Sequence, residues 1–157
     1  MLTAGEFCNR EVVIGQELEH VTEVARRMRE HHVGSVVIVQ QSAQGPTPIG
    51  VLTDRDIVLG LVAVDPSYLE RAIVKDLLPG KLVTVGEDAS LYEVIVRMRS
   101  HGIRRLPVVS DAGTLVGIIA FDDLVVHLGE ELQRLGSLIE REVDSESKRR
   151  PGLRQGA

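Results

Sequence analysis

The stretch GVLTDRDI, residues 50–57, has the same outline as GIIAFDDL, residues 117–124. Each begins with a glycine and two apolar residues, and each ends with an aspartate followed by an aliphatic residue. The two stretches differ in the middle, where Thr53 of the first is replaced by Ala120 in the second. The pair therefore indicates a duplicated unit in which only one copy carries a hydroxyl at this position.

The duplication extends well beyond these eight residues. A shift of 70 positions places Glu23–Val39 over Glu93–Val109, so that the tripeptide Arg-Met-Arg recurs at residues 27–29 and 97–99. The glycine-led stretches then align at a shift of 67, because the first copy has a longer loop, QQSAQGPTP at residues 40–48. Self-similarity at a fixed period indicates a repeat architecture, and the Gly and Pro of the loop predict a turn between strands.

Each copy has the same predicted order, β-α-β-β-α. Short apolar strands at Val12–Ile14 and Leu82–Val85 come first. An amphipathic helix follows, for which Ser90 is the predicted N-cap in the second copy. Two aliphatic strands come next, and a second helix begins at Thr53 or Ala120. One unit buries too little surface alone, so the fold class is α/β (α+β), with two repeats packed sheet to sheet about a pseudo-two-fold axis. The predicted domains are residues 6–64 and 74–128, followed by a C-terminal helix and tail at 129–157.

Composition narrows the function classes. The chain has 157 residues, of which 43% are hydrophobic, and a net charge of −5 that argues against nucleic-acid binding over the whole surface. Cys8 is the only cysteine, so an internal disulfide is excluded, and a small buried hydrophobic residue is the simplest interpretation. No leader or apolar run long enough to span a bilayer is present, so we expect a cytoplasmic protein with no membrane partner.

The repeats resemble a tandem pair of CBS domains, together called a Bateman module. The residues that carry the resemblance are GVLTDRD at 50–56, the segment from Val74 to Met98, and HGIRRLPVVSDAGTLVGIIAFDDL at 101–124. The resemblance implies a regulatory, non-catalytic protein, not an enzyme, that binds an adenine nucleotide between its two domains. It also implies a homodimer and no required cofactor, with Mg²⁺ accompanying the ligand if this is ATP. Two alternatives stay open: S-adenosylmethionine binding, and a structural module without a small ligand. The sequence does not identify the regulated protein partner.

Thr53 and Asp56 allow two interpretations from chemistry alone. Thr-x-x-Asp at a helix start is a capping box, in which the hydroxyl and the carboxylate satisfy backbone N–H groups. The same hydroxyl can bond a phosphate or ribose oxygen, and the same carboxylate can accept both hydroxyls of a ribose diol. The two roles are compatible, because a cap can be released to a ligand.

The resemblance implies two clefts, each built from both repeats. The first cleft takes these eight residues: Thr53, Arg55, Asp56, Val83, Thr84, Ile103, Arg104 and Arg105. Val83 and Ile103 would contact a purine ring, Thr84 would bond the base edge, and the two adjacent arginines suit phosphate oxygens.

The second cleft takes these seven residues: Val13, Ile14, Val33, Gly34, Ser35, Ala120 and Asp123. It lacks the hydroxyl, the polar base contact and both arginines, and retains only the carboxylate of Asp123. We therefore predict one tight nucleotide per chain, in the first cleft, and a weaker second cleft.

Three further expectations complete the analysis. The histidines His31 and His101 are predicted at equivalent helix ends, where they favour the helix dipole, and no metal site is expected. The aliphatic helix faces in residues 21–28 and 91–98 are predicted to meet a second chain. An apolar stripe that includes Leu128 and Leu132 extends the last helix, and the polar residues beyond Val143 are expected to be disordered.

Overall fold

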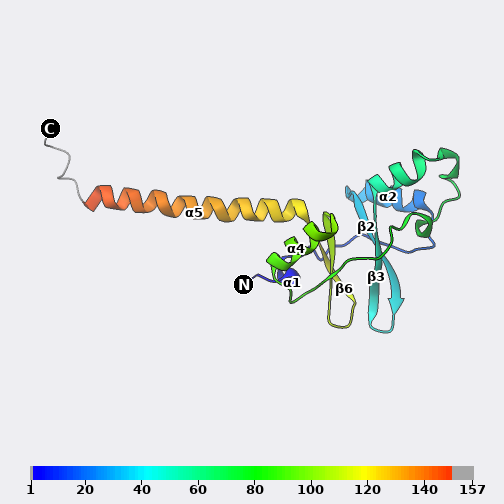
Figure 1. Ribbon diagram of the computed structural model, residues 1–157, viewed down its shortest axis with the longest axis horizontal. Coiled ribbons are helices and arrows are strands. Elements are labelled where there is room, and N and C mark those ends of the chain that lie inside the picture. The colour runs from blue at the N-terminus through cyan, green and yellow to red at the C-terminus, as the bar shows by residue number, and fades with distance from the viewer. Residues whose placement is uncertain (1, 150–157) are drawn as a thin grey trace. The chain divides into compact units, whose positions relative to one another are not determined.

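The computed structural model describes residues 2–149, and the chain divides into two units at Ala120. The first unit, residues 1–120, contains both repeats, and the second is built on one helix, α5 (Phe121–Arg149). Figure 1 shows the two strand groups of the first unit, with β3 (Gly45–Thr53) and β6 (Leu115–Ala120) in contact.

The first repeat forms a three-stranded sheet in the order β1-β2-β3. β1 (Ile14–Gly15) runs parallel to β2 (Ser35–Ser42), and β2 is antiparallel to β3. α2 (Val21–His31) connects the first two strands, and α3 (Asp54–Ile57) follows β3 directly and continues as a π-helical turn, η1 (Val58–Val62). The predicted order of elements is confirmed for this repeat.

The second repeat has the same topology, β4-β5-β6. β4 (Val85–Gly86) is parallel to β5 (Arg105–Val109), and β5 is antiparallel to β6. α4 (Leu91–His101) begins at the predicted N-cap, because the Ser90 hydroxyl accepts a hydrogen bond of 3.2 Å from the Glu93 N–H. The two sheets confirm the fold class that the repeats predicted.

The segments that lead into the two repeats are exchanged between them. Residues 3–9, which include the short helix α1 (Ala4–Phe7), bond to the second repeat: Ala4 N–H donates to Ala89 O at 2.7 Å and Gly5 N–H to Glu87 O at 2.8 Å. The equivalent bonds of the other segment, η3 (Val74–Leu77), go from Val74 N–H to Glu19 O and from Lys75 N–H to Glu17 O. The two segments lie 70 positions apart, as do their partners, so the pseudo-symmetry includes the exchange.

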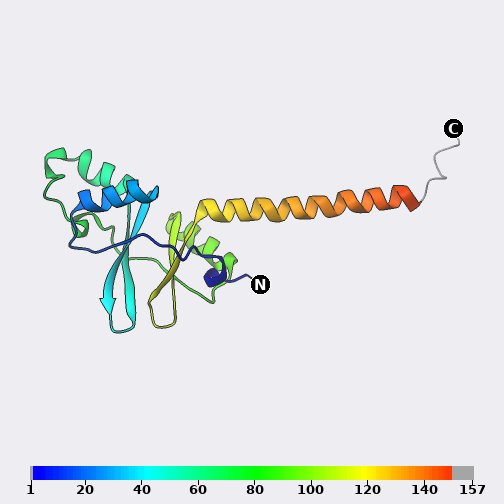
Figure 2. The ribbon, with the colours of Figure 1, turned by 180° about the vertical axis from the view of Figure 1, so that it is seen from behind.

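Figure 2 shows the N-terminal segment crossing over the strands, on the side facing the viewer, from one repeat to the other. Between the repeats the chain makes a 3-10 turn, η2 (Pro66–Tyr68), before it reaches Ala72, whose carbonyl accepts from Val21 N–H at 3.0 Å. Neither crossing was predicted, because a helical turn of four residues is too short to show a periodicity that distinguishes it from a loop.

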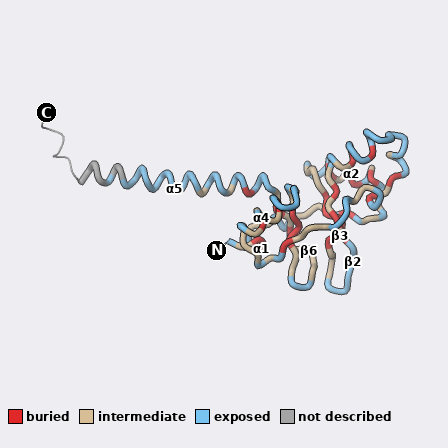
Figure 3. Tube along the Cα trace, viewed as in Figure 1, coloured by how far each residue is buried: buried red, intermediate tan, exposed pale blue. Residues whose placement is uncertain are grey.

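The core is aliphatic, as the near absence of aromatic residues requires. Val36–Val39 of β2 are all buried, and Leu106 and Val108 of β5 have no exposed surface. Continuous burial along one strand is typical of a strand covered on both faces. Figure 3 shows this buried interior within the strands, with exposed residues at the hairpin tips.

The structure corrects three of the predicted boundaries. The loop at residues 40–48 is mostly strand, because β2 runs to Ser42 and β3 begins at Gly45, whose φ of 125° makes the turn. The first strands are shorter and lie later than predicted, starting at Ile14 and Val85. The polar residues beyond Val143 continue α5 to Arg149, since no Gly or Pro interrupts residues 137–149. Residues 150–157 of the expected tail lie outside the described residues.

The apolar face of α2 is used inside the chain. Val21 and Val24 have no exposed surface and Met28 is 6% exposed, because all three belong to the core cluster of the first repeat. The prediction that this face would meet a second chain is therefore wrong for α2. On α4, Val94 and Met98 are also buried, whereas Tyr92 and Val96 are exposed.

Gly117 tests how closely the exchanged N-terminal segment packs on β6. A Cβ at this position would overlap Cys8 Sγ and lie 2.8 Å from Asn9 O. Asn9 and Ile118 exchange two backbone hydrogen bonds of 3.0 Å here. We expect Gly117→Ala to lower the free energy of unfolding by about 1–3 kcal/mol, because the segment must move away.

Gly86→Ala is the matched control, because a Cβ there meets no atom within 4 Å. Chemical denaturation of both variants measures the effect. Equal stabilities of the two variants would contradict the close packing of Cys8 and Asn9 against β6.

Candidate functional site

A cavity of about 500 Å³ lies between the two repeats. Its walls come from the β3–α3 turn of the first repeat, from the segment that precedes β4, and from the α4–β5 turn of the second repeat. Seven of the eight residues predicted for the first cleft line it: Thr53, Arg55, Asp56, Val83, Ile103, Arg104 and Arg105. Three segments far apart in the sequence are therefore brought to one cavity.

Thr53 and Asp56 form the predicted capping box at the start of α3. Asp56 N–H donates to Thr53 Oγ1 at 3.1 Å, and Thr53 N–H donates to Asp56 Oδ2 at 2.9 Å. The Thr53 hydroxyl also donates to Asp56 Oδ2, at 2.7 Å. Within the described residues these bonds occupy only one oxygen of the carboxylate, so the other oxygen is available to accept a donor in the cavity.

The cavity contains one more cation and one more carboxylate than the sequence predicted. Its lining carries four cationic side chains and two carboxylates: Arg55, Lys81, Arg104, Arg105, Asp54 and Asp56. Lys81 and Asp54 were not predicted. Lys81 lies in the short Pro-Gly-Lys segment before β4, and its position between the repeats is the only sequence signal that could have identified it. Apolar surface comes from Val51, Leu82, Val83 and Ile103.

Arg105 of the second repeat lies beside Gly34 of the first repeat. A Cβ built on Gly34 would lie 3.6 Å from Arg105 Nη2 and 3.3 Å from Asp54 Oδ2. Gly34 and Ser35 are the first-repeat equivalents of Arg104 and Arg105. The small residues of the first repeat therefore lie next to the cation of the second repeat and to Asp54.

Thr84 is the predicted first-cleft residue that does not line the cavity. It lies next to Val83, which does, and its carbonyl accepts a hydrogen bond of 2.8 Å from Arg97 Nη1. The guanidinium of Arg97 also pairs with Glu93 at 2.9 Å. Arg97 thus fixes the backbone of the strand that forms one wall of the cavity.

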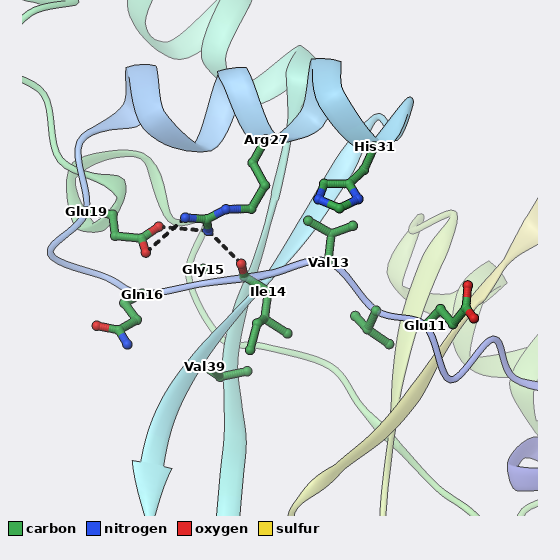
Figure 4. Close-up of a pocket in the computed structure, with 10 residues that line it drawn as sticks. Glu11, Val13, Ile14, Gly15, Gln16, Glu19, Arg27, His31 and Val39 are labelled. Carbon is green, nitrogen blue, oxygen red and sulfur yellow. Dashed lines mark hydrogen bonds and ion pairs between the residues drawn. The ribbon is translucent and has the colours of Figure 1, made fainter.

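The first repeat uses its equivalent arginine in the same way. Arg27 Nη1 donates to Ile14 O at 2.6 Å, and the guanidinium pairs with Glu19 at 3.0 Å (Figure 4). The first arginine of each Arg-Met-Arg motif, Arg27 or Arg97, therefore bonds a backbone carbonyl at the first strand of its repeat. We call this contact the arginine clamp. The motif aligns the two repeats in the sequence, but its role as a backbone contact was not predicted.

The residues predicted for the second cleft line different surfaces. Val13 and Ile14 line the hollow shown in Figure 4, together with Arg27 and His31. Val33 and Gly34 line another hollow, between α2 and α3. Ser35 and Ala120 end strands: Ser35 pairs with Thr53, and Ala120 pairs with Arg105. Asp123 lies in the first turn of α5 and is exposed.

Two titratable groups away from the cavity have displaced pKa values. Burial raises the pKa of the Cys8 thiol, and the positive charge of Arg10 acts in the opposite direction. A thiol with a raised pKa is a poor nucleophile, which supports a packing role for Cys8. Hydrogen bonds from the side chain and backbone of Ser67 lower the pKa of Asp65.

Comparison with known proteins agrees with this architecture. Residues 4–63 and 74–130 each match the CBS domain. The chain belongs to the CBS domain family. It contains two copies, so it is a CBS domain pair, and the resemblance described from its repeats is confirmed.

The most informative relatives are proteins of similar length. The chain is 37% identical to Hypoxic response protein 1 of Mycobacterium tuberculosis over 132 residues, which cover 83% of this chain and 87% of that protein. A crystal structure of Hypoxic Response Protein I with two coordinated zinc ions has a TM-score of 0.68 at 35% identity, covering 81% of this chain and 99% of that one.

A second solved CBS structure contains a nucleotide. The cytosolic domain of the Mg²⁺ channel MgtE, in complex with ATP, has a TM-score of 0.64 and is 31% identical to this chain. The match covers 78% of this chain and 47% of the MgtE domain.

Two further observations concern the described residues of the CBS pair. Among residues 2–149, no three His, Cys, Asp or Glu side chains are grouped so that they could hold a metal ion. No helix in the same range has the length and apolarity needed to cross a membrane. His31 and His101 end α2 and α4, as predicted, and His101 Nδ1 lies 2.9 Å from Arg97 O.

The arginine clamp of the second repeat can be tested by stability. Arg97→Met keeps most of the apolar stem and removes the guanidinium that bonds Thr84 O. We expect a loss of about 1–2 kcal/mol in the free energy of unfolding, since a partly exposed charged donor is removed.

The control is Arg99→Met, because Arg99 is an exposed residue two positions further along the same helix. Urea denaturation of the two variants should separate them by about 1 kcal/mol or more. If Arg99→Met were as unstable as Arg97→Met, helix propensity rather than the strand contact would explain the loss.

Proposed function

We propose that this CBS pair binds an adenine nucleotide in the cavity between its repeats and thereby regulates a partner protein. The observation that carries the proposal is the composition of the cavity: four cations, one available carboxylate oxygen on Asp56 and an apolar wall, all within one space. A volume of about 500 Å³ lies in the range of about 300–1,000 Å³ that is typical of small-molecule sites.

Each part of a nucleotide has a matching group in the cavity. Val83 and Ile103 offer apolar contact to a purine. Asp56 can accept a hydrogen bond from a ribose hydroxyl through the oxygen that the cap leaves available. The guanidinium groups of Arg104 and Arg105 suit the planar, bidentate recognition of phosphate oxygens. This assignment gives five of the seven predicted lining residues a role.

The charge of the cavity favours a phosphate ligand over S-adenosylmethionine. Four cationic side chains surround the space, and two carboxylates offset them only in part. A sulfonium cation would add to this positive charge, whereas phosphate oxygens would neutralise it. The ATP complex of the related MgtE domain supports the same ligand class.

The proposal includes three further points. The chain is regulatory and does not catalyse a reaction, and it acts as a homodimer on a protein partner that remains to be identified. Mg²⁺ accompanies the ligand only if the ligand is ATP. The second predicted cleft, with Ala120 in place of the hydroxyl, binds nucleotide weakly, so one tight site per chain is proposed.

Calorimetric titration of the full chain with AMP, ADP, ATP and S-adenosylmethionine tests the ligand class. We expect a stoichiometry of one for the preferred nucleotide, and at least about tenfold weaker binding of S-adenosylmethionine, because like charges are brought together in a partly enclosed site. Two equal sites per chain would contradict the assignment of the first cleft. The absence of heat and of a thermal shift with all four ligands would favour a structural module.

Substitution of Asp56 tests its role in nucleotide binding, provided that its role in the cap of α3 is measured as well. Asp56→Asn removes the charge that would accept the ribose hydroxyls and should weaken nucleotide binding about tenfold to a hundredfold. Because the same change also weakens the cap of α3, affinity and thermal stability should both be measured.

Asp76→Asn is the matched control for the cap. Asp76 Oδ2 accepts from Ile73 N–H at 3.1 Å, in the same position of η3, but Asp76 does not line the nucleotide cavity. The Asp76→Asn variant should have lower thermal stability but unchanged affinity for the nucleotide. Asp123→Asn should retain nucleotide affinity as well. A larger loss of affinity from Asp123→Asn than from Asp56→Asn would mean that the working cleft is assigned wrongly.

A further inference from the structure

The helix α5 carries an exposed apolar stripe along most of its length. Six residues spaced alternately four and three apart form it: Phe121, Val125, Leu128, Leu132, Leu135 and Ile139. Each is between 43% and 69% exposed. From Val125 onwards, none of the described side chains of α5 is buried, and Figure 3 shows most of the described part of the helix as exposed.

The spacing specifies what kind of surface can cover the stripe. An average period of 3.5 residues is that of positions a and d in a coiled coil, where each side chain inserts between four residues of a facing helix. A helix that packs on a sheet or a globular surface has a wider apolar face with a period of 3.6. The stripe from Phe121 to Ile139 spans about 27 Å at 1.5 Å per residue. The spacing and the length of the stripe both fit another long helix as its partner.

We propose that the stripe of α5 pairs with the stripe of a second copy of this chain in an antiparallel two-stranded coiled coil. This goes beyond nucleotide binding and does not depend on it. It assigns a surface to the homodimer that the buried face of α2 cannot provide.

The exposed area is sufficient for a homodimer. Six large apolar side chains exposed to this degree leave on the order of 600 Å² per helix, and two copies reach on the order of 1,200 Å², the lower end of stable interfaces. Gly129 and Gly136 are one heptad apart beside the stripe, and a Cβ at either meets no atom within 4 Å. Glycine costs helix stability, but here it lets two helices approach closely.

Charge favours the antiparallel orientation. Residues 121–131 contain four acidic residues and no lysine or arginine, whereas residues 132–149 contain four basic and four acidic residues. Parallel pairing would place the two acidic halves together and bring Glu142, at a d position, opposite its own copy. Antiparallel pairing places each acidic half beside a neutral half, sets Glu142 opposite Val125, and opposes the helix dipoles.

Sedimentation velocity of the full chain tests the proposal. We expect a dimer at micromolar concentration, and at least a tenfold weaker dimer after the double change Leu132→Glu and Leu135→Glu. Because both side chains are exposed, the variant should fold. The control is Val126→Glu, since Val126 is 63% exposed on the same helix but lies off the stripe; it should dimerise like the original chain.

Three outcomes would overturn the proposal. If the unsubstituted chain is monomeric, the pairing is excluded. If, in addition, the double change lowers the melting temperature of that monomer, the stripe packs on its own chain instead. An unchanged dimer in the double variant would place the interface elsewhere. Equal losses in the double variant and in Val126→Glu would show that added charge, not the stripe, controls assembly.

Cysteine cross-linking in a Cys8→Ala background tests the orientation. Antiparallel pairing sets Leu128 opposite Ile139 of the second copy, so a mixture of Leu128→Cys and Ile139→Cys chains should form mixed disulfide dimers. Neither variant alone should do so, because its own copy lies 11 residues away, about 16 Å along the helix. Efficient self-cross-linking of Leu128→Cys would show a parallel pair and overturn the antiparallel assignment.

Discussion

The reciprocal exchange of the two leading segments is the constraint on which the rest of the first unit depends. Ala4 and Gly5 bond to the carbonyls of Ala89 and Glu87, while Val74 and Lys75 bond to those of Glu19 and Glu17. Each repeat has only three strands, which is a marginal core for an independent domain. Because each leading segment completes the other repeat, the repeats are held together by main-chain bonds that do not depend on side-chain identity, and the cavity between them has fixed walls.

The cavity depends on this arrangement in a second way. Its floor contains the start of α3, where Thr53 and Asp56 close a capping box. Its other walls flank β4 and β5 of the second repeat, where Arg97 holds the carbonyl of Thr84. The cap satisfies the backbone of one wall and the arginine that of the other, so the side chains that face the cavity are positioned before any ligand enters.

Duplication followed by divergence explains the asymmetry of the two repeats. Both repeats keep the arginine clamp, through Arg27 and Arg97, because each first strand has only two residues and needs an external donor. The paired arginines are present in one repeat only. Gly34 lies beside Arg105 and Asp54, and a second pair of guanidinium groups at the equivalent position would repel the first. One basic cavity is thus favoured over two.

Sequence alone determined the repeat, the β-α-β-β-α order, the N-caps Thr53 and Ser90, and most of the residues that line the cavity. These features depend on local periodicity and on polar groups a few positions apart. Both are visible in the sequence of a single strand or helix. The sequence also recorded the apolar stripe of α5. Tertiary structure alone decided the segment exchange, the presence of Lys81 in the cavity, the burial of the α2 face and the role of the repeated arginine. Each of these is a contact between residues at least 13 positions apart, such as Arg97 with Thr84, and such contacts leave no periodic trace in the residues that make them.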